Sequence, residues 1–389
     1  MNLKPAVKVS RRISEIGREG WDACAANPAY NANPFVSFDF LDIVEESGCA
    51  VERQGWGPQH LSVEDEAGNV AAVMPLYLKS HSQGEYIFDQ GWADAYERAG
   101  GRYYPKLLSA APFTPATGPR LLVRPDVEAD EARAILLGGA VEVCSRYEAS
   151  SLHINFPNAA EWTWLGAQGL ALREGQQYHW VNRDYADFEG FLAALSSGRR
   201  KTIRRERRDA LAQVEVFALT GVDITEDHWD AFFGFYMDTG SRKWGTPYLN
   251  RLFFSLLGER MADRVLLIMA QRHGRWIAGA LNLIGGDCLY GRNWGCVEDV
   301  PFLHFELCYY QAINWAIGRG LARVEAGAQG QHKIARGYLP VAVRSAHYIA
   351  DPMLRGPVED FVRREREAVE NELEWLAEEY SPFRHETND

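Results

Sequence analysis

The segment Glu325–Tyr338 concentrates side chains that can exchange protons and hold anions. It reads EAGAQGQHKIARGY and brings an acid, a histidine, a lysine and an arginine close to the end of an expected strand. A strand-end carboxylate at Glu325 can accept the proton of an attacking amine, and His332 is the alternative base. We therefore predict catalytic roles for Glu325, His332 and Lys333. The alternative is a polar surface turn that carries ordinary charges.

The same segment has the composition of an anion-binding turn. Its glycines allow backbone N–H groups to approach a phosphate closely, and the cations of Lys333 and Arg336 add charge-assisted hydrogen bonds. The residues predicted to hold the anionic part of a donor are Gly327, Gln329, Gly330 and Arg336.

Composition limits the class of protein. The chain has 389 residues, 47% of them apolar, and a formal net charge of -12, which predict a folded protein of two domains. The acidic balance argues against general nucleic-acid binding outside local basic patches. The six cysteines contain no CxxC pair, and no His and carboxylate spacing suits a metal, so we expect neither disulfides nor a metal. Without a signal peptide or a stretch of ~20 apolar residues, we expect a cytoplasmic protein with no membrane span.

Two stretches about two hundred residues apart have the same pattern. His60–Lys79 and Val265–Ile284 each predict two strands around a tight turn, at Gly68-Asn69 and Gly274-Arg275. Each is followed by an expected third strand, Gly84–Trp92 or Gly286–Trp294, and then by a helix and another strand. These are Glu131–Tyr147 with Ser151–Phe156, and His304–Arg319 with Leu321–Gly327. The matched order indicates duplication of one unit.

This order, with antiparallel strands first, predicts an α+β fold in which each mixed, mainly antiparallel sheet is flanked by helices. We place the first domain at 1–185, a helical linker at 186–245, the second domain at 246–355, and a charged helix with its tail at 356–389.

The first copy is longer by roughly thirty residues before its last strand, and long ordered loops are often functional. Its aromatic and polar groups could line a cleft for substrate, or could only cover a sheet edge. The residues predicted to contact substrate are Asp89, Trp92, Tyr104, Lys106, Phe113 and Thr114, together with His304 of the second copy. His304 also shares a helix face with Cys308. Cys308 is then either a reactive thiolate beside this histidine or, more simply, a buried thiol.

The linker contains the basic run Arg199–Arg208, which has seven cations and one acid. On a helix, Arg200, Arg204 and Arg208 share a face, which suits a phosphate-rich partner such as tRNA or a lipid-linked head group. The alternative is a solvated helix that balances an acidic protein.

Two long segments, Leu76–Leu122 and His304–Pro340, resemble the FemAB-like predicted N-acyltransferases of bacterial cell-wall metabolism. The resemblance covers nearly the whole chain. It implies tandem GNAT-like domains and acyl transfer to an amine of a small molecule or peptide. The donor would be acyl-CoA or aminoacyl-tRNA, with no permanently bound cofactor. The alternative function is a non-catalytic GNAT-fold module that recognises a peptide, a glycan or a lipid-linked cell-wall precursor.

The resemblance also implies a turn for the coenzyme A pyrophosphate before the long helix. The corresponding positions are Arg292 to Val297, where Arg292 and Gly295 fit the Q/R-x-x-G-x-G/A pattern. Val297 departs from it, because the pattern ends on a small residue. Arg292 and Gly295 are therefore expected to bind the donor.

Overall fold

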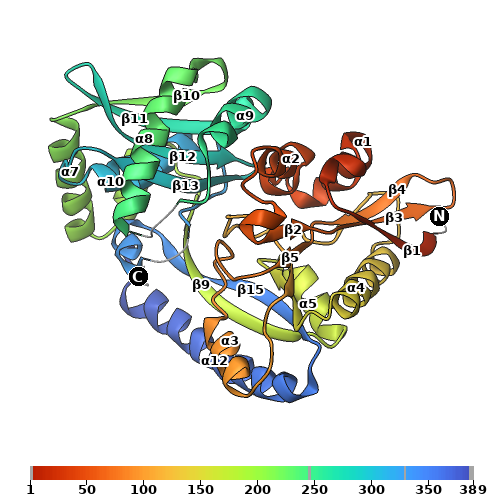
Figure 1. Cartoon of the computed structure of the whole chain (residues 1–389). Helices are drawn as coiled ribbons and strands as arrows, with labels where there is room; N and C mark the ends of the chain where they lie inside the picture. The colour runs from red at the N-terminus through yellow and green to blue at the C-terminus, as the bar shows by residue number, and fades with distance from the viewer. Residues whose placement is uncertain (1–2, 244–246, 328–329, 385–389) are drawn as a thin grey trace. The chain divides into compact units, whose positions relative to one another are not determined.

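The computed structural model describes residues 3–243, 247–327 and 330–384 (Figure 1). The chain folds as two compact units. Unit 1 comprises Met1–Gly175 and Val343–Glu370, and unit 2 comprises Gln176–Ala342 and Asn371–Asp389. The chain passes between them within strands β9 (Ala171–Val181) and β15 (Leu339–Ile349) and within helix α12 (Pro352–Glu379). The boundaries of these units therefore differ from the expected ones at 185, 245 and 355.

Unit 1 contains two sheets. Strands β1 (Leu3–Ser10), β3 (His60–Asp65), β4 (Val70–Met74) and β7 (Leu122–Val123) form an antiparallel sheet in that order. The turn between β3 and β4 contains Gly68 with a positive φ of 90°, which explains the glycine there. Helix α4 (Ala129–Arg146) packs on β1, β3 and β4, and it confirms the predicted helix.

The other strands of unit 1 are β2 (Trp56–Pro58), β5 (Tyr77–Lys79), β6 (Lys106–Ser109) and β8 (Ser151–Asn155). Strand β6 pairs parallel to β8, and the end of β15 pairs antiparallel to β8. The remaining helices of this unit are α1 (Arg18–Ala25), α2 (Phe38–Glu46), α3 (Gln90–Arg98) and α5 (Ala159–Ala167).

The predicted third strand of the first copy, Gly84–Trp92, is wrong. Its end is the first turn of α3, and the strand that runs parallel to the post-helix strand is β6. Glu85 and Asp89 are buried and form ion pairs with the ammonium group of Lys106. These ion pairs hold the segment in place of the backbone hydrogen bonds expected of a strand.

Unit 2 has one sheet in the order β10 (Glu215–Thr220), β11 (Val265–Arg272), β12 (Arg275–Ile284), β13 (Cys288–Cys296), β14 (Arg323–Glu325) and β9. All neighbours are antiparallel except β13 and β14, which are parallel. The predicted helix after β13 is present as α10 (Leu303–Phe305), a π-helical turn (Glu306–Tyr310) and α11 (Gln311–Gly318). It packs its apolar residues against one face of this sheet.

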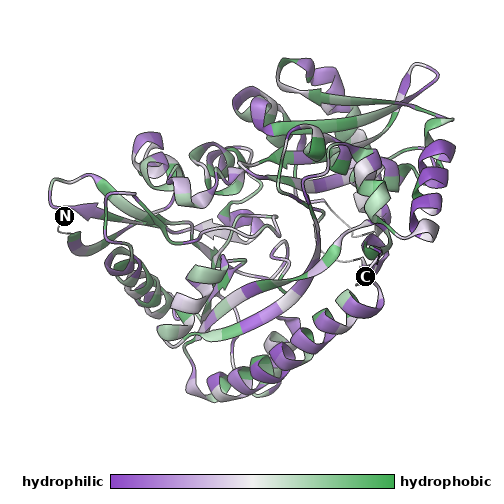
Figure 2. Cartoon of the chain, turned by 180° about the vertical axis from the view of Figure 1, so that it is seen from behind, coloured by the Kyte–Doolittle hydropathy of each residue, from purple (hydrophilic) through white to green (hydrophobic). Residues whose placement is uncertain are grey.

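Four further helices belong to unit 2: α6 (Phe188–Ala194), α7 (Ser197–Leu211), α8 (Glu226–Lys243) and α9 (Arg251–Met261). Helix α7 is strongly hydrophilic (Figure 2), but Ile203, Glu206 and Ala210 are buried. The charged C-terminal helix is confirmed as α12. None of the described helices is long and apolar enough to cross a membrane.

Close packing of α8 on β13 requires a glycine at position 295. A Cβ atom at Gly295 would lie 2.3 Å from the backbone carbonyl carbon and oxygen of Phe235 in α8. Because backbone atoms cannot rotate away, any side chain here must displace the helix.

We predict that Gly295→Ala lowers the free energy of unfolding by about 1–3 kcal/mol through overpacking. Gly318→Ala, where a Cβ meets no atom within 4 Å, is the matched control and should be neutral or slightly stabilising. Urea unfolding followed by circular dichroism measures both. Equal stability of the two variants would contradict this account of the α8–β13 contact.

Candidate functional site

The parallel pairing of β13 with β14 ends at the register pair Tyr290 and Glu325. On its other side, β14 pairs antiparallel with β9, which places His179 opposite Glu325. Residues in register on neighbouring strands point to the same face of a sheet, so these three side chains form one row. The opposite face carries Leu289, Val324 and Trp180, which are buried in the hydrophobic core.

Glu325 is buried, and its two carboxylate oxygens have different environments. Oε1 accepts a hydrogen bond of 3.3 Å from Nε of Arg323, which also forms an ion pair of 2.7 Å with Asp287. Oε2 has no hydrogen-bond partner among the described residues and lies 3.9 Å from Nε2 of His179. One oxygen is thus fixed by a cation, and the other is a buried acceptor whose hydrogen-bonding capacity is unused among the described residues.

His179 is poised as a neutral base. Burial lowers its pKa below the ordinary value, and the charges of Arg323 and Lys333 lower it further, whereas Glu325 opposes them. A neutral imidazole beside a carboxylate can accept a proton from an amine, and the carboxylate then stabilises the imidazolium. Nε2 of His179 also lies 3.2 Å from Oε1 of Gln177 on the same strand.

The predicted anion-binding cations are both buried and engaged within unit 2. Nζ of Lys333 donates to the carbonyl oxygens of Ala326 at 2.8 Å and Gly327 at 3.0 Å, which fixes the turn that follows Glu325. Burial lowers the pKa of Lys333 to about 8. Arg336 donates to both carboxylate oxygens of Glu206 at 2.8 and 3.0 Å, and its guanidinium lies over the ring of Phe305.

The two predicted histidines are brought together in an aromatic cluster. Nε2 of His332 lies 3.0 Å from the hydroxyl of Tyr309. The ring of His304 packs against Trp294 and Tyr309 at centroid distances of 5.2 and 5.3 Å, and its centroid lies 6.4 Å from that of His332. Burial lowers the pKa of His332, which keeps this second candidate base neutral near pH 7.

The glycine-rich turn after β14 uses the conformational freedom of its glycines. Gly327 and Gly330 have positive φ angles of 72° and 107°, while Gln329 lies outside the described residues. In contrast, the expected pyrophosphate turn at Arg292 to Val297 is wrong as a local structure. Arg292 and Gly295 lie within strand β13, and Gly295 is covered by α8.

The predicted substrate residues of the first copy form a buried charged cluster in unit 1. Nζ of Lys106 donates to Ser82 at 2.7 Å, to Glu85 at 2.8 Å and to Asp89. The hydroxyl of Tyr103 donates to Asp89 at 2.7 Å. The cations and carboxylates compensate each other, as buried charges must.

The other predicted residues of this loop surround the cluster or lie beside it. The hydroxyl of Tyr104 lies 2.8 Å from Oγ of Ser82, and the ring of Trp92 packs edge-on against His347 at 4.9 Å. Phe113 packs against Trp56, and Thr114 donates to the carbonyl of Pro112 at 2.9 Å. Phe113 and Thr114 are buried, so in unit 1 they act as packing groups.

Prediction from the sequence missed His179. The residue lies in the expected first domain, whereas Glu325 lies in the expected second one. Only the non-local pairing of β9 with β14 makes them neighbours. The available signal was the alternation of polar Gln177 and His179 with apolar Tyr178 and Trp180, which marks a strand with one polar face.

The buried Lys79 of unit 1 gives a test of the charged cluster. Its Nζ lies 3.8 Å from Glu85, and burial lowers its pKa from 10.5 to about 7. Between those values the unfolded chain binds this proton and the folded chain does not, so Lys79 makes stability rise with pH across that window. We predict that Lys79→Met removes the contribution of Lys79 to the increase in the free energy of unfolding between pH 7 and 10. Chemical denaturation at several pH values measures it, with exposed Lys8→Met as control, and an unchanged pH slope would contradict the assignment.

The chain is similar in sequence and fold to known proteins. A family model described as FemAB-like, peptidoglycan biosynthesis/recognition, matches residues 12–385. No curated protein matches the sequence. Among solved structures, FemX has 13% identity and a TM-score of 0.55, covering 88% of this chain and 98% of FemX.

Two other solved structures have a similar fold. The C-terminal domain of a putative lysylphosphatidylglycerol synthetase from Agrobacterium fabrum has 9% identity and a TM-score of 0.55, covering 90% of this chain and 96% of that domain. A protein of unknown function from Bacteroides thetaiotaomicron has 11% identity and a TM-score of 0.51, covering 88% of this chain and 99% of that protein. At these identities the likeness shows the fold alone, and it agrees with the predicted α+β class. Because the family model spans almost the whole sequence, the chain belongs to the FemAB-like family of peptidoglycan biosynthesis and recognition proteins.

Proposed function

We propose that this protein is an N-acyltransferase whose base is the pair formed by His179 and Glu325. The observation that carries the proposal is the buried row on β13, β14 and β9. In this row a neutral imidazole lies 3.9 Å from a carboxylate oxygen that has no hydrogen-bond partner in the described part of the chain. Amine acylation needs such a group, because an ammonium ion has no lone pair until a proton is removed. His332 is the second candidate base, hydrogen-bonded to Tyr309.

In the proposed reaction, Glu325 Oε2 binds the acceptor ammonium ion and His179 takes one of its protons. The amine nitrogen then attacks the acyl carbonyl, the C–N bond forms, and the bond from the carbonyl carbon to the leaving oxygen or sulfur breaks. The imidazolium returns its proton to the leaving group, and the second proton that the nitrogen loses on forming the amide passes to water. Lys333 supports this site by fixing the Ala326 and Gly327 carbonyls, and it positions Glu325 rather than binding donor phosphate.

Of the two donors, aminoacyl-tRNA has the better support. The pyrophosphate turn expected for coenzyme A is occupied by strand β13 under α8. Helix α7 instead presents Arg199, Lys201 and Arg205, which are exposed and form no ion pair with a carboxylate among the described residues. Three other cations of the run form ion pairs: Arg207 pairs with buried Glu306 at 3.1 Å, Arg204 pairs with Glu189, and Arg208 pairs with Asp209. The acceptor that fits the family is a peptide amine of a peptidoglycan precursor.

One observation favours the alternative of a binding module without catalysis. Lys333 and Arg336, the cations expected to hold donor phosphates, are already bonded to the protein. A site that only recognises a peptide or glycan would not need them to be available. An acyltransferase would convert its substrates, whereas a binding module would bind the peptide or glycan without converting it.

We predict that His179→Asn and Glu325→Gln each lower the rate of aminoacyl transfer at least ~100-fold, the usual contribution of a general base. Transfer is measured with radiolabelled aminoacyl-tRNA and a lysine-containing stem peptide. Glu298→Gln is the matched control in unit 2, because Glu298 forms ion pairs with Arg272 and Arg275, outside the row around Glu325. Thermal denaturation checks that the variants are folded. Wild-type rates in both variants would contradict the base assignment, and tight peptide binding without transfer in the wild type would favour the binding module.

We also predict that the double variant Arg199→Glu with Arg205→Glu weakens tRNA binding at least ~10-fold and reduces its salt dependence, because phosphate contacts release counterions. Filter binding at several salt concentrations measures both effects. The control is Arg98→Glu with Arg102→Glu, which makes the same change in net charge on exposed residues of unit 1. Equal loss in both double variants would show a net-charge effect and contradict a specific role for α7.

A further inference from the structure

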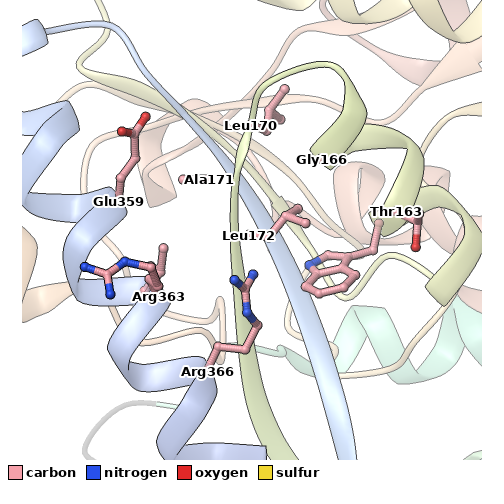
Figure 3. Close-up of a pocket in the computed structure, with 10 residues that line it drawn as sticks. Thr163, Gly166, Leu170, Ala171, Leu172, Glu359, Arg363 and Arg366 are labelled. Carbon is pink, nitrogen blue, oxygen red and sulfur yellow. The ribbon is translucent and has the colours of Figure 1, made fainter.

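A cavity in unit 1 lies between helix α5, the start of β9 and helix α12 (Figure 3). Its volume is about 410 Å³, within the range of small-molecule sites. The cavity belongs to neither the row around Glu325 nor the charged cluster around Lys106. Its lining residues are Trp162, Thr163, Gly166, Leu170, Ala171, Leu172, Glu359, Val362, Arg363 and Arg366.

The wall of this cavity is mainly apolar. Leu170 and Val362 belong to two buried clusters of unit 1, and Leu172 packs at the edge of the first. The lack of a side chain at Gly166 makes room for Leu172, since a Cβ there would lie 2.5 Å from Cδ1 of that leucine. The indole N–H of Trp162 donates to the carbonyl of Ser345 at 3.0 Å, so the ring presents only its apolar surface and is held in place.

Two arginines line this apolar wall, and they differ in their partners. Three arginines of α12 in unit 1 are satisfied: Arg355 by the carbonyl of Ile349, Arg363 by Asp360, and Arg364 by the carbonyl of Asp360. Arg366 has no hydrogen bond or ion pair recorded within the described part of the chain. Figure 3 shows its guanidinium turned toward Leu172, whereas Arg363 extends away and Glu359 lies at the other end.

We propose that this cavity is a binding site for a small amphiphilic anion, with its apolar body against Trp162 and Leu172 and its carboxylate or phosphate on Arg366. A half-buried guanidinium without a carboxylate is an incomplete ion pair beside an apolar surface, and an anionic head group completes it bidentately. The apolar tail gains by leaving water. This site goes beyond the proposed acyl transfer and does not depend on it.

The test is isothermal titration calorimetry of the full chain with dodecanoate, dodecyl phosphate, dodecanol and acetate, at concentrations that leave the far-UV circular dichroism unchanged. Dodecanoate or dodecyl phosphate should bind, and the tighter of the two identifies the head group. Dodecanol and acetate should bind at least ~10-fold more weakly, because each lacks one half of the recognised chemistry.

The variant Arg366→Gln should weaken binding of the anion at least ~10-fold, while Arg364→Gln on the same helix should leave it unchanged. Arg364 is exposed and Arg366 is half-buried, and neither substitution removes a buried apolar group, so both variants are expected to fold. Absence of binding by both long-chain anions would overturn the proposal. Equal binding of dodecanol, or equal losses in the two variants, would overturn it as well.

Discussion

The parallel pairing of β13 with β14 is the constraint on which unit 2 depends. Because it ends at Tyr290 and Glu325, the polar row lies where the ladder stops. The same register puts Leu289, Val324 and Trp180 into the core on the other face, so a slip of one residue would exchange core and site. Antiparallel β9 then adds His179 from a distant part of the chain. Burial of this row lowers the pKa of His179, so the packing that buries the row also keeps this imidazole neutral.

The two units use buried charge in different ways. In unit 1, Lys106 joins Glu85 and Asp89 in a compensated cluster that holds the segment before β6. In both units a buried carboxylate has an oxygen without a hydrogen-bond partner among the described residues: Glu85 and Asp89 in unit 1, and Glu325 in unit 2. The difference is the neighbouring group, because the carboxylates of unit 1 face lysine ammonium groups, whereas Oε2 of Glu325 faces the imidazole of His179. Ion pairs with lysine fix the fold, and a buried acceptor beside a neutral imidazole can take up the donor of a ligand.

Much of the architecture could be predicted from the sequence, because hydrophobic periodicity and glycine turns are local signals. The strand pairs, both long helices and the α+β class follow from them. Gly84–Trp92 was wrong because its polar residues pair with Lys106, a contact that no local pattern encodes. Arg292 and Gly295 lie in a strand rather than a turn because β13 pairs with β12, and α8 packs on Gly295, which is again a non-local contact. Glu325 was found from its strand-end position, but His179 required the register of β9, and the roles of both remain predictions.

The central claim is that His179 and Glu325 act as an electrostatically coupled pair. Its most direct test is the titration of His179 by NMR with isotope-labelled histidine. We predict a pKa below the ordinary histidine value, because burial dominates. Since the charge of Glu325 raises that pKa, Glu325→Gln should lower it further. A pKa at or above the ordinary value, or one that Glu325→Gln leaves unchanged, would contradict the account.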